Sequence, residues 1–110
     1  MVGDVITIGD EVVVREAVKL MNRHEIGCLV VVKDRKPIGI VTERDMLKRV
    51  LSTTRDPRAV KVGEIMSKPL VVMEPKMNIS DAIKLMFEHG IKKLPIVQRG
   101  HLVGLVTLTD

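Results

Sequence analysis

The chain has 110 residues, 45% of them hydrophobic, which is near the usual size of one domain and enough for a real core. It contains no apolar run near the roughly 18 residues of a membrane span, no signal segment and only one cysteine, so we expect a soluble cytoplasmic protein without disulfides or a membrane partner. The net charge of +4 suits an anionic partner, but a single aromatic residue, Phe87, leaves no stacking platform for single-stranded nucleic acid.

The first third of the chain predicts a strand, a helix and a second strand. Residues 5–8 form the first strand, and residues 9–11 turn the chain. A helix is predicted over residues 14–24, because its apolar positions recur with helical spacing. The continuous apolar run at 28–32 is typical of a strand covered on both faces. The predicted helical stripe consists of Val14, Ala17, Val18 and Met21.

The pattern β-α-β-β-α is completed by a return strand and a second helix. Residues 34–37 turn the chain, and residues 38–41 form a strand that we expect to be antiparallel to the preceding one. A helix then runs from Thr42 to about Leu51.

The polar segment 52–61 reads as a linker, and residues 62–66 as a short helical turn before a second copy of the pattern. Asn78 is a good N-cap with Asp81 three residues later, and Gly90 suits a left-handed helix stop. The second helical stripe consists of Ile79, Ala82, Ile83 and Met86. The predicted elements are strand 70–73, helix 79–89, strand 94–98 and strand 101–106.

The two copies align without a gap at an offset of 65 residues, from Val5–Asp45 to Leu70–Asp110. Two copies are too few for a solenoid and suit a pseudo-symmetric pair. No counterpart of the helix after Thr42 follows Asp110, so we expect apolar surface that a continuation or a partner chain covers. The identical pairs are Ala17/Ala82, Lys19/Lys84, Leu20/Leu85, Met21/Met86, His24/His89, Ile26/Ile91, Leu29/Leu94, Val32/Val97, Gly39/Gly104, Val41/Val106, Thr42/Thr107 and Asp45/Asp110.

The stretch Gly-Ile-Val-Thr-Glu-Arg-Asp at 39–45 returns as Gly-Leu-Val-Thr-Leu-Thr-Asp at 104–110. Taken once, Thr-x-x-Asp before a helix indicates a capping box. Its duplication favours a second interpretation, a nucleotide site. The helix N-terminus and the threonine would contact phosphate, and the carboxylate would accept hydrogen bonds from a ribose. The glycine would let the backbone come close.

These paired motifs, the strand Leu94-Pro95-Ile96-Val97 and the turn Val62-Gly-Glu-Ile-Met66 together resemble a tandem pair of CBS (cystathionine-beta-synthase-type) domains over nearly the whole chain. The resemblance implies an α+β (mixed α/β) fold of two pseudo-symmetric β-α-β-β-α repeats packed sheet to sheet. We place repeat 1 at residues 1–51, the linker and lead-in turn at 52–66, and repeat 2, without its last helix, at 67–110.

The resemblance also implies a non-catalytic regulatory module with two clefts for adenosine compounds: AMP, ADP, ATP or S-adenosylmethionine, with no cofactor required. Carried over by position, the aspartate holds ribose and the threonine reaches phosphate. The cleft of copy two then consists of Thr107, Thr109 and Asp110, the adenine wall Asp4, Ile6, Ile26 and Gly27, and the phosphate-facing Lys92 and Lys93.

By the same carry-over, the cleft of copy one uses Thr42, Arg44 and Asp45. Its phosphate-facing positions hold Gly27 and Cys28 where copy two has two lysines, so we expect unequal clefts, with the Asp110 cleft the better phosphate binder. The wall of the copy-one cleft is Val71, Ile91 and Lys92.

Three other classes of function remain to be weighed. A structural module with empty clefts would only dimerise its parent protein. The Leu47 and Leu51 side of a helix is the candidate homodimer contact, and a regulated partner protein or domain belongs to the sensor interpretation. Nucleic-acid binding would rest on the positive charge alone. Enzymatic and metal chemistry are disfavoured, because the sequence shows no acid–base pair and its histidines and Cys28 lack ligand spacing.

Overall fold

A computed structural model describes residues 5–68, 70–73, 76–99 and 101–108. The chain forms two compact units. The N-terminal unit spans Ile6–Leu70, and the C-terminal unit contains the described residues from Val71 onward together with Val5. Within the described residues, no helix has the length and apolar character needed to cross a membrane.

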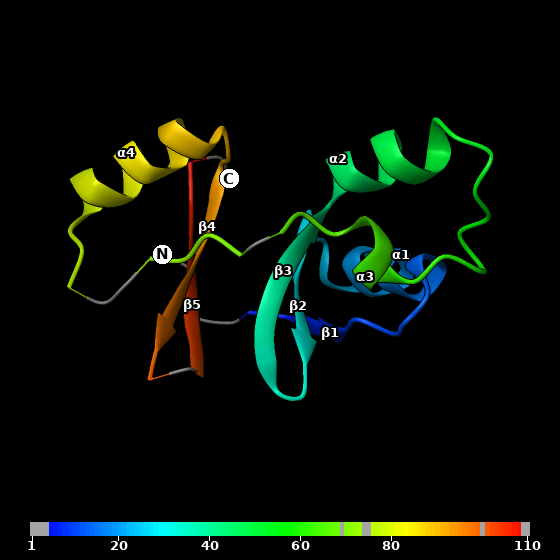
Figure 1. The fold of residues 1–110 in the computed structure, drawn as a ribbon, viewed down its shortest axis with the longest axis horizontal. Helices are drawn as coiled ribbons and strands as arrows, with labels where there is room; N and C mark the ends of the chain where they lie inside the picture. The colour runs from blue at the N-terminus through cyan, green and yellow to red at the C-terminus, as the bar shows by residue number, and fades with distance from the viewer. Residues whose placement is uncertain (1–4, 69, 74–75, 100, 109–110) are drawn as a thin grey trace. The chain divides into compact units, whose positions relative to one another are not determined.

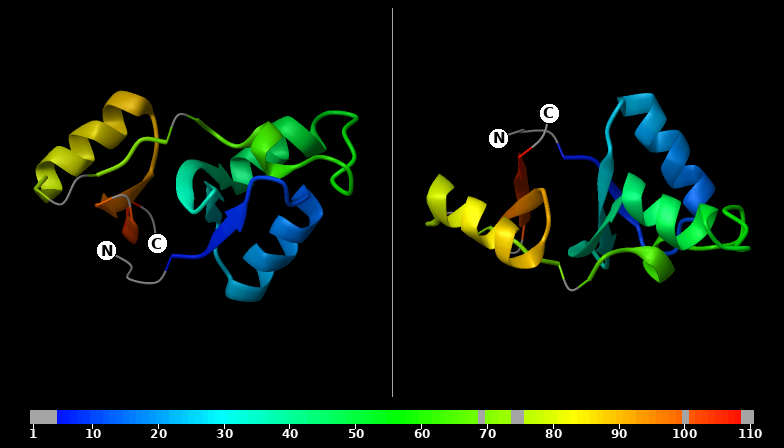
Figure 2. Two further views of the ribbon diagram at one scale, coloured as in Figure 1. Left: turned by 60° about the horizontal axis from the view of Figure 1, so that its bottom comes forward. Right: turned by 90° about the horizontal axis from the view of Figure 1, so that it is seen from above.

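The N-terminal unit is a three-stranded sheet with its helices on one face (Figures 1 and 2). The strand order is β1-β2-β3, with β1 parallel and β3 antiparallel to the central β2. The α-helix α2 continues directly into the π-helical turn η1. The two elements together match the predicted second helix. The elements are β1 (Thr7–Gly9), α1 (Val14–His24), β2 (Cys28–Lys33), β3 (Lys36–Thr42), α2 (Glu43–Met46), η1 (Leu47–Leu51) and α3 (Val62–Ile65).

The core of the N-terminal unit forms where the apolar stripe of α1 meets alternate residues of the sheet. Leu29 and Val31 of β2 are fully buried in this core, because successive strand residues point to opposite faces. The predicted stripe of α1 is confirmed at three positions, whereas Val18 is 38% exposed at its margin. The buried residues of the stripe are Val14, Ala17 and Met21.

The segment predicted to be a linker packs into the N-terminal unit. The Val14 N–H donates to the Val60 carbonyl oxygen at 2.8 Å, and residues Val13 and Lys61 form an antiparallel bridge. An ion pair between Lys61 and Glu11 ties the segment to the turn after β1, and its hydrogen bond lowers the pKa of the Glu11 carboxyl. The hydrophobic residues of the segment that join the core are Val60, Val62, Ile65 and Met66.

The described part of the C-terminal unit repeats the α1-β2-β3 part of this pattern. Each of its elements lies 65 residues after its counterpart, and its antiparallel pair β4-β5 has a register shift at Ile96/Val97 that matches the one at Val31/Val32. The predicted mixed α+β class and the predicted doubling are both confirmed. The elements are α4 (Ile79–His89), β4 (Lys93–Gln98) and β5 (His101–Thr107).

The predicted strand at residues 70–73 is wrong, because only one bridge forms there, between Met73 and Ile96. In the N-terminal unit the Val30 N–H donates to the Ile6 carbonyl oxygen at 3.2 Å and extends the parallel ladder. Pro95 stands at the position of Val30 in the repeat and has no N–H to donate. The sequence Leu-Pro-Ile-Val therefore shortens the strand pairing of the second copy.

The two long helices end in the same left-handed conformation, but on different residues. The predicted cap between Asn78 and Asp81 is confirmed, and so is the helix stop at Gly90, which has a φ of 63°. At the equivalent end of α1 the residue is Glu25, with a φ of 53°. A side chain in this region costs about 1–2 kcal/mol, and glycine avoids that cost.

We therefore expect Glu25→Gly to stabilise the N-terminal unit by about 0.5–1 kcal/mol, the relief of strain less the entropy that glycine loses on folding. Urea unfolding followed by far-ultraviolet circular dichroism measures this, since the chain has no Trp or Tyr for fluorescence. The matched control is Gly90→Ala, which should lower the free energy of unfolding, because it places a side chain on a residue with a φ of 63°. A loss of stability in Glu25→Gly would show that the glutamate is not strained.

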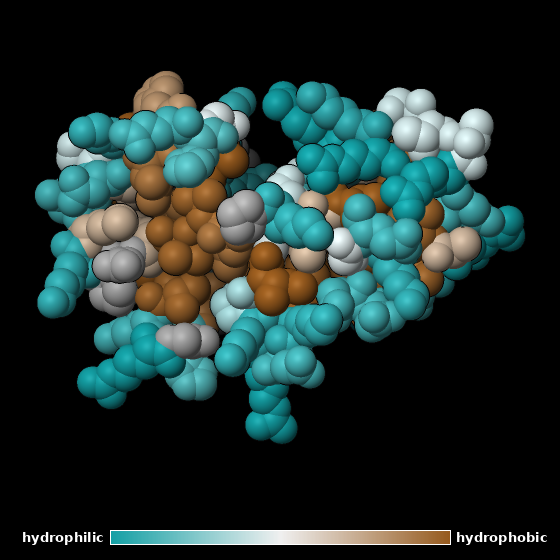
Figure 3. All heavy atoms as spheres, in the orientation of Figure 1, coloured by the Kyte–Doolittle hydropathy of each residue, from teal (hydrophilic) through white to brown (hydrophobic). Residues whose placement is uncertain are grey.

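The exposed face of α4 is unusually apolar. Ala82 and Met86 are buried as predicted, but Ile79 and Ile83 are exposed, and Phe87 on the same side of the helix is 75% exposed. In the view of Figure 3, a wide hydrophobic area of the C-terminal unit lies over its strands, below α4. In α1 the counterpart of Ile79 is Val14, which is buried against the segment that carries Val60.

Candidate functional site

The end of β3 and the start of α2 form the capping box that the sequence predicts. Thr42 is the N-cap residue, with an extended backbone conformation. Its Oγ1 accepts a hydrogen bond from the Asp45 N–H at 3.2 Å, and the Asp45 carboxylate oxygen Oδ2 accepts one from the Thr42 N–H at 2.9 Å. The pair thus satisfies backbone donors that the helix leaves open, and it fixes the position of the carboxylate.

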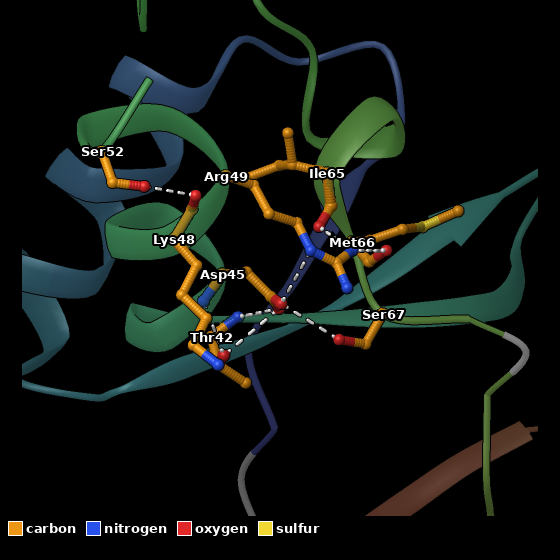
Figure 4. Close-up of polar contacts among 8 residues, drawn as sticks. All are labelled: Thr42, Asp45, Lys48, Arg49, Ser52, Ile65, Met66 and Ser67. Carbon is orange, nitrogen blue, oxygen red and sulfur yellow. Dashed lines mark hydrogen bonds and ion pairs between the residues drawn. The ribbon is translucent and has the colours of Figure 1, made fainter.

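Asp45 is the one charged residue among the described residues that is buried, with 6% of its surface exposed. Besides the capping bond, Oδ2 accepts from the Thr42 hydroxyl at 3.2 Å, and Oδ1 accepts from the Ser67 hydroxyl at 3.0 Å. The Nε atom of Arg49 lies 3.9 Å from Oδ1 (Figure 4). These partners hold the buried carboxylate in a fixed position within the fold.

Arg49 also anchors the chain segment that carries Ser67. Its guanidinium donates to the carbonyl oxygens of Ile65 at 2.9 Å and Met66 at 3.1 Å, as Figure 4 shows. Ser67 in turn exchanges two backbone hydrogen bonds with Ile40 of β3, at 3.1 and 2.8 Å. The segment 65–67 therefore runs along β3 and closes over the carboxylate.

Gly39 is what allows this close approach. A Cβ atom at Gly39 would lie 2.7 Å from the Met66 sulfur and 2.9 Å from the Ser67 carbonyl oxygen. The sequence predicted that this glycine lets backbone come close, and in this unit the backbone that comes close to Gly39 is that of Ser67.

Several residues predicted for the copy-one site do gather around Thr42. Cys28 is its partner in the β2-β3 register, and the Glu43 N–H donates to the Gly27 carbonyl oxygen at 3.1 Å. Arg44 lies on the adjacent turn and is exposed, whereas Cys28 is buried. At this junction Arg44 is thus a positively charged side chain that reaches solvent.

The C-terminal unit repeats the arrangement with two lysines. Lys93 is the register partner of Thr107, and the Leu108 N–H donates to the Lys92 carbonyl oxygen at 2.9 Å. Lys92 is exposed and Lys93 is half-buried. Three residues predicted for this site, Asp4, Thr109 and Asp110, lie outside the described residues.

Four of the predicted wall residues are apolar side chains at the margins of the two cores. Ile6 and Ile26 pack against the core of the N-terminal unit. Val71 and Ile91 pack against the core of the C-terminal unit. All four are partly buried, and their contact with a ligand stays a prediction.

Sequence reasoning missed Ser67 and Arg49, the two residues that meet Asp45 from outside the motif. The repeat gave no signal for Ser67, because its counterpart 65 residues earlier is Val2. The counterpart of Arg49 lies past the last residue. The contact with Ser67 joins residues 22 positions apart, which only the folded chain reveals.

The described residues offer no group of three His, Cys, Asp or Glu side chains that could hold a metal ion. In the described residues, a buried carboxylate, two hydroxyls and the Arg49 guanidinium come together where β3 passes into α2.

The family model described as CBS domain matches the chain twice, at residues 1–52 and 62–110. The chain belongs to the CBS-domain family, whose members are typically regulatory nucleotide-sensing modules.

Relatives and solved structures agree with this family. The chain is 41% identical over 109 residues to "Uncharacterized protein MK0525" of Methanopyrus kandleri, covering 97% of this chain and 56% of that protein. It is 38% identical over 110 residues to the CBS domain-containing protein YhcV of Bacillus subtilis, covering 100% of this chain and 78% of the relative. A hexameric CBS-CP12 protein from bloom-forming cyanobacteria superposes with a TM-score of 0.90 at 34% identity, over 100% of this chain and 65% of that one.

Proposed function

We propose that this chain is a non-catalytic regulatory module that binds an adenosine compound and reports its level to an attached or associated protein. Candidate ligands are AMP, ADP, ATP and S-adenosylmethionine. The proposal concerns the Thr42–Asp45 junction in the N-terminal unit and its counterpart at Thr107 in the C-terminal unit.

The observation that carries this proposal is the Asp45 carboxylate, which is held at a fixed point where β3 passes into α2. An ionised carboxylate has about four lone-pair positions and no donor, so it suits the vicinal hydroxyls of a ribose. Thr42 lies beside it as a hydroxyl donor for a phosphate oxygen. Membership of a family of nucleotide-sensing modules points to the same ligand class.

The two junctions differ in charge. Lys92 and Lys93 lie next to Thr107, whereas Gly27 and Cys28 hold the equivalent positions next to Thr42. Ammonium groups attract phosphate, so we expect the Thr107 junction to prefer the more highly phosphorylated ligands.

The test is calorimetric titration of the four adenosine compounds into the wild-type chain and into Asp45→Asn. The asparagine keeps the size of the side chain and an oxygen for the Thr42 N–H, but it loses the charge. A hydrogen bond to a charged group is worth about 1.5–3 kcal/mol, so affinity at this site should fall by about tenfold or more. Circular dichroism checks that the variant folds.

Two comparisons make this result specific. Glu43→Gln alters an exposed acid in the same helical turn and should leave affinity unchanged. The wild-type chain should bind a 2′-deoxy analogue of AMP more weakly than it binds AMP. Asp45→Asn should bind the analogue and AMP with equal affinity, because the partner of the 2′-hydroxyl is already lost. If no adenosine compound binds the wild-type chain, the proposed function is wrong.

A second candidate, a structural dimerisation module, is favoured by one observation. Leu47 and Leu51 on the outer side of the helical segment after Thr42 are 58% and 67% exposed, and Phe87 on α4 is more exposed still. A dimeric mass in sedimentation equilibrium, together with no heat from any adenosine compound, would support this candidate.

A further inference from the structure

The Asp45 carboxylate holds three hydrogen bonds in the structure, which leaves little room for a ribose. Oδ2 accepts from the Thr42 N–H and hydroxyl, and Oδ1 accepts from the Ser67 hydroxyl. With about four acceptor positions on a carboxylate, two ribose hydroxyls exceed what remains. One of the present partners has to leave when the ribose binds.

Ser67 is the partner best placed to leave. The Thr42 N–H belongs to the capping box, and its loss would open the start of the helix. The Thr42 hydroxyl can turn its proton toward a phosphate, but the Asp45 N–H holds its oxygen beside Oδ2, so this turn clears no space at the carboxylate. The Ser67 hydroxyl is held by a single bond to Oδ1, and Ser67 is half-buried, so its side chain can turn to solvent.

We infer that the Ser67 hydroxyl is an internal competitor for the ribose at Asp45, and that this residue sets the affinity of the site. This inference rests on the proposed function, because it names the group that the ligand displaces. Ser67 lies on the segment 65–67, which Arg49 and Ile40 hold against β3 and which leads along the chain from the N-terminal unit to the C-terminal unit. Ligand binding at Asp45 therefore removes one of the contacts that hold this segment against β3 and α2.

The inference predicts that removing the hydroxyl improves binding. In Ser67→Ala the ligand no longer has to break the bond to Oδ1, so affinity should rise by about three- to tenfold. Because the ribose is common to adenosine, AMP and ATP, the gain should be the same factor for each of the three that binds.

The experiment is calorimetric titration of adenosine, AMP and ATP into the wild-type chain, Ser67→Ala, Ser67→Thr and Ser52→Ala. Ser67→Thr keeps a hydroxyl and should retain the wild-type affinity. Ser52→Ala is the matched control, because the Ser52 hydroxyl donates to the Lys48 carbonyl oxygen in the same helical region and does not contact Asp45. Thermal unfolding of each variant confirms that it folds.

The outcomes separate the inference from the function on which it rests. Tighter binding in Ser67→Ala, with Ser67→Thr and Ser52→Ala at the wild-type level, supports the competition. Unchanged or weaker binding in Ser67→Ala, while the wild-type chain binds, overturns the inference alone. No binding by the wild-type chain or any variant overturns the proposed function and the competition together.

Discussion

Replacing Ile65 by alanine is expected to destabilise the N-terminal unit by about 3–4 kcal/mol. Ile65 is fully buried and belongs to the core cluster that includes Leu29 and Val31. Large-to-small substitution at such a site loses the transfer free energy of the removed methyl groups and leaves a cavity, which together cost about 2–5 kcal/mol. Urea unfolding monitored by circular dichroism gives the free energy of unfolding directly.

The result for Ile65 decides whether the segment predicted as a linker and lead-in turn is part of the first folding unit. The matched control is Leu51→Ala, a comparable truncation at a side chain that is 67% exposed, which should cost well under 1 kcal/mol. Equal effects for the two variants would mean that residues 62–66 do not contribute to the core of this unit.

Gly39→Ala is expected to destabilise the same unit by about 2–3 kcal/mol. The added methyl group would meet the Met66 sulfur at 2.7 Å and the Ser67 carbonyl oxygen at 2.9 Å. The methionine side chain can move, but the backbone oxygen is fixed by its bond from the Ile40 N–H, so β3 and the segment 65–67 have to separate.

The control for this prediction is Gly9→Ala, where a methyl group would meet only the Val12 side chain at 3.7 Å, an ordinary contact. We expect its unfolding free energy to lie within about 0.5–1 kcal/mol of the wild-type value. If Gly39→Ala is equally mild, residues 66 and 67 do not pack against β3 as closely as the structure shows. Because Ser67 moves with this segment, Gly39→Ala is also a sensitive probe of its contact with Asp45.

Local sequence signals predicted the regular elements well. The helices at 14–24 and 79–89 have the predicted bounds, because apolar spacing marks both and the cap at Asn78 and the stop at Gly90 also mark the second. The wrong strand at 70–73 shows the limit of the repeat argument. The match to the first strand of copy one suggested a strand, but Pro95 on the neighbouring strand lacks the donor that the pairing needs.

The polar segment after Leu51 was harder to interpret. Its composition is that of a solvated linker, and only Ala59 and Val60 interrupt it before α3. Its hydrogen bonds to the start of α1 join backbone atoms, so the side chains of the segment give no signal from which these bonds could be predicted.

By itself the sequence determined the doubled α+β fold, the family and the capping pair of Thr42 and Asp45, because each depends on spacing within one short stretch or on the constant offset of 65 residues. Only the tertiary structure decided that the Asp45 carboxylate is already held by Ser67 and flanked by Arg49. Those contacts depend on where a distant segment of the chain comes to lie in three dimensions. No local pattern encodes that position, since it results from the packing of Ile65 and Met66 into the core and from the space left at Gly39.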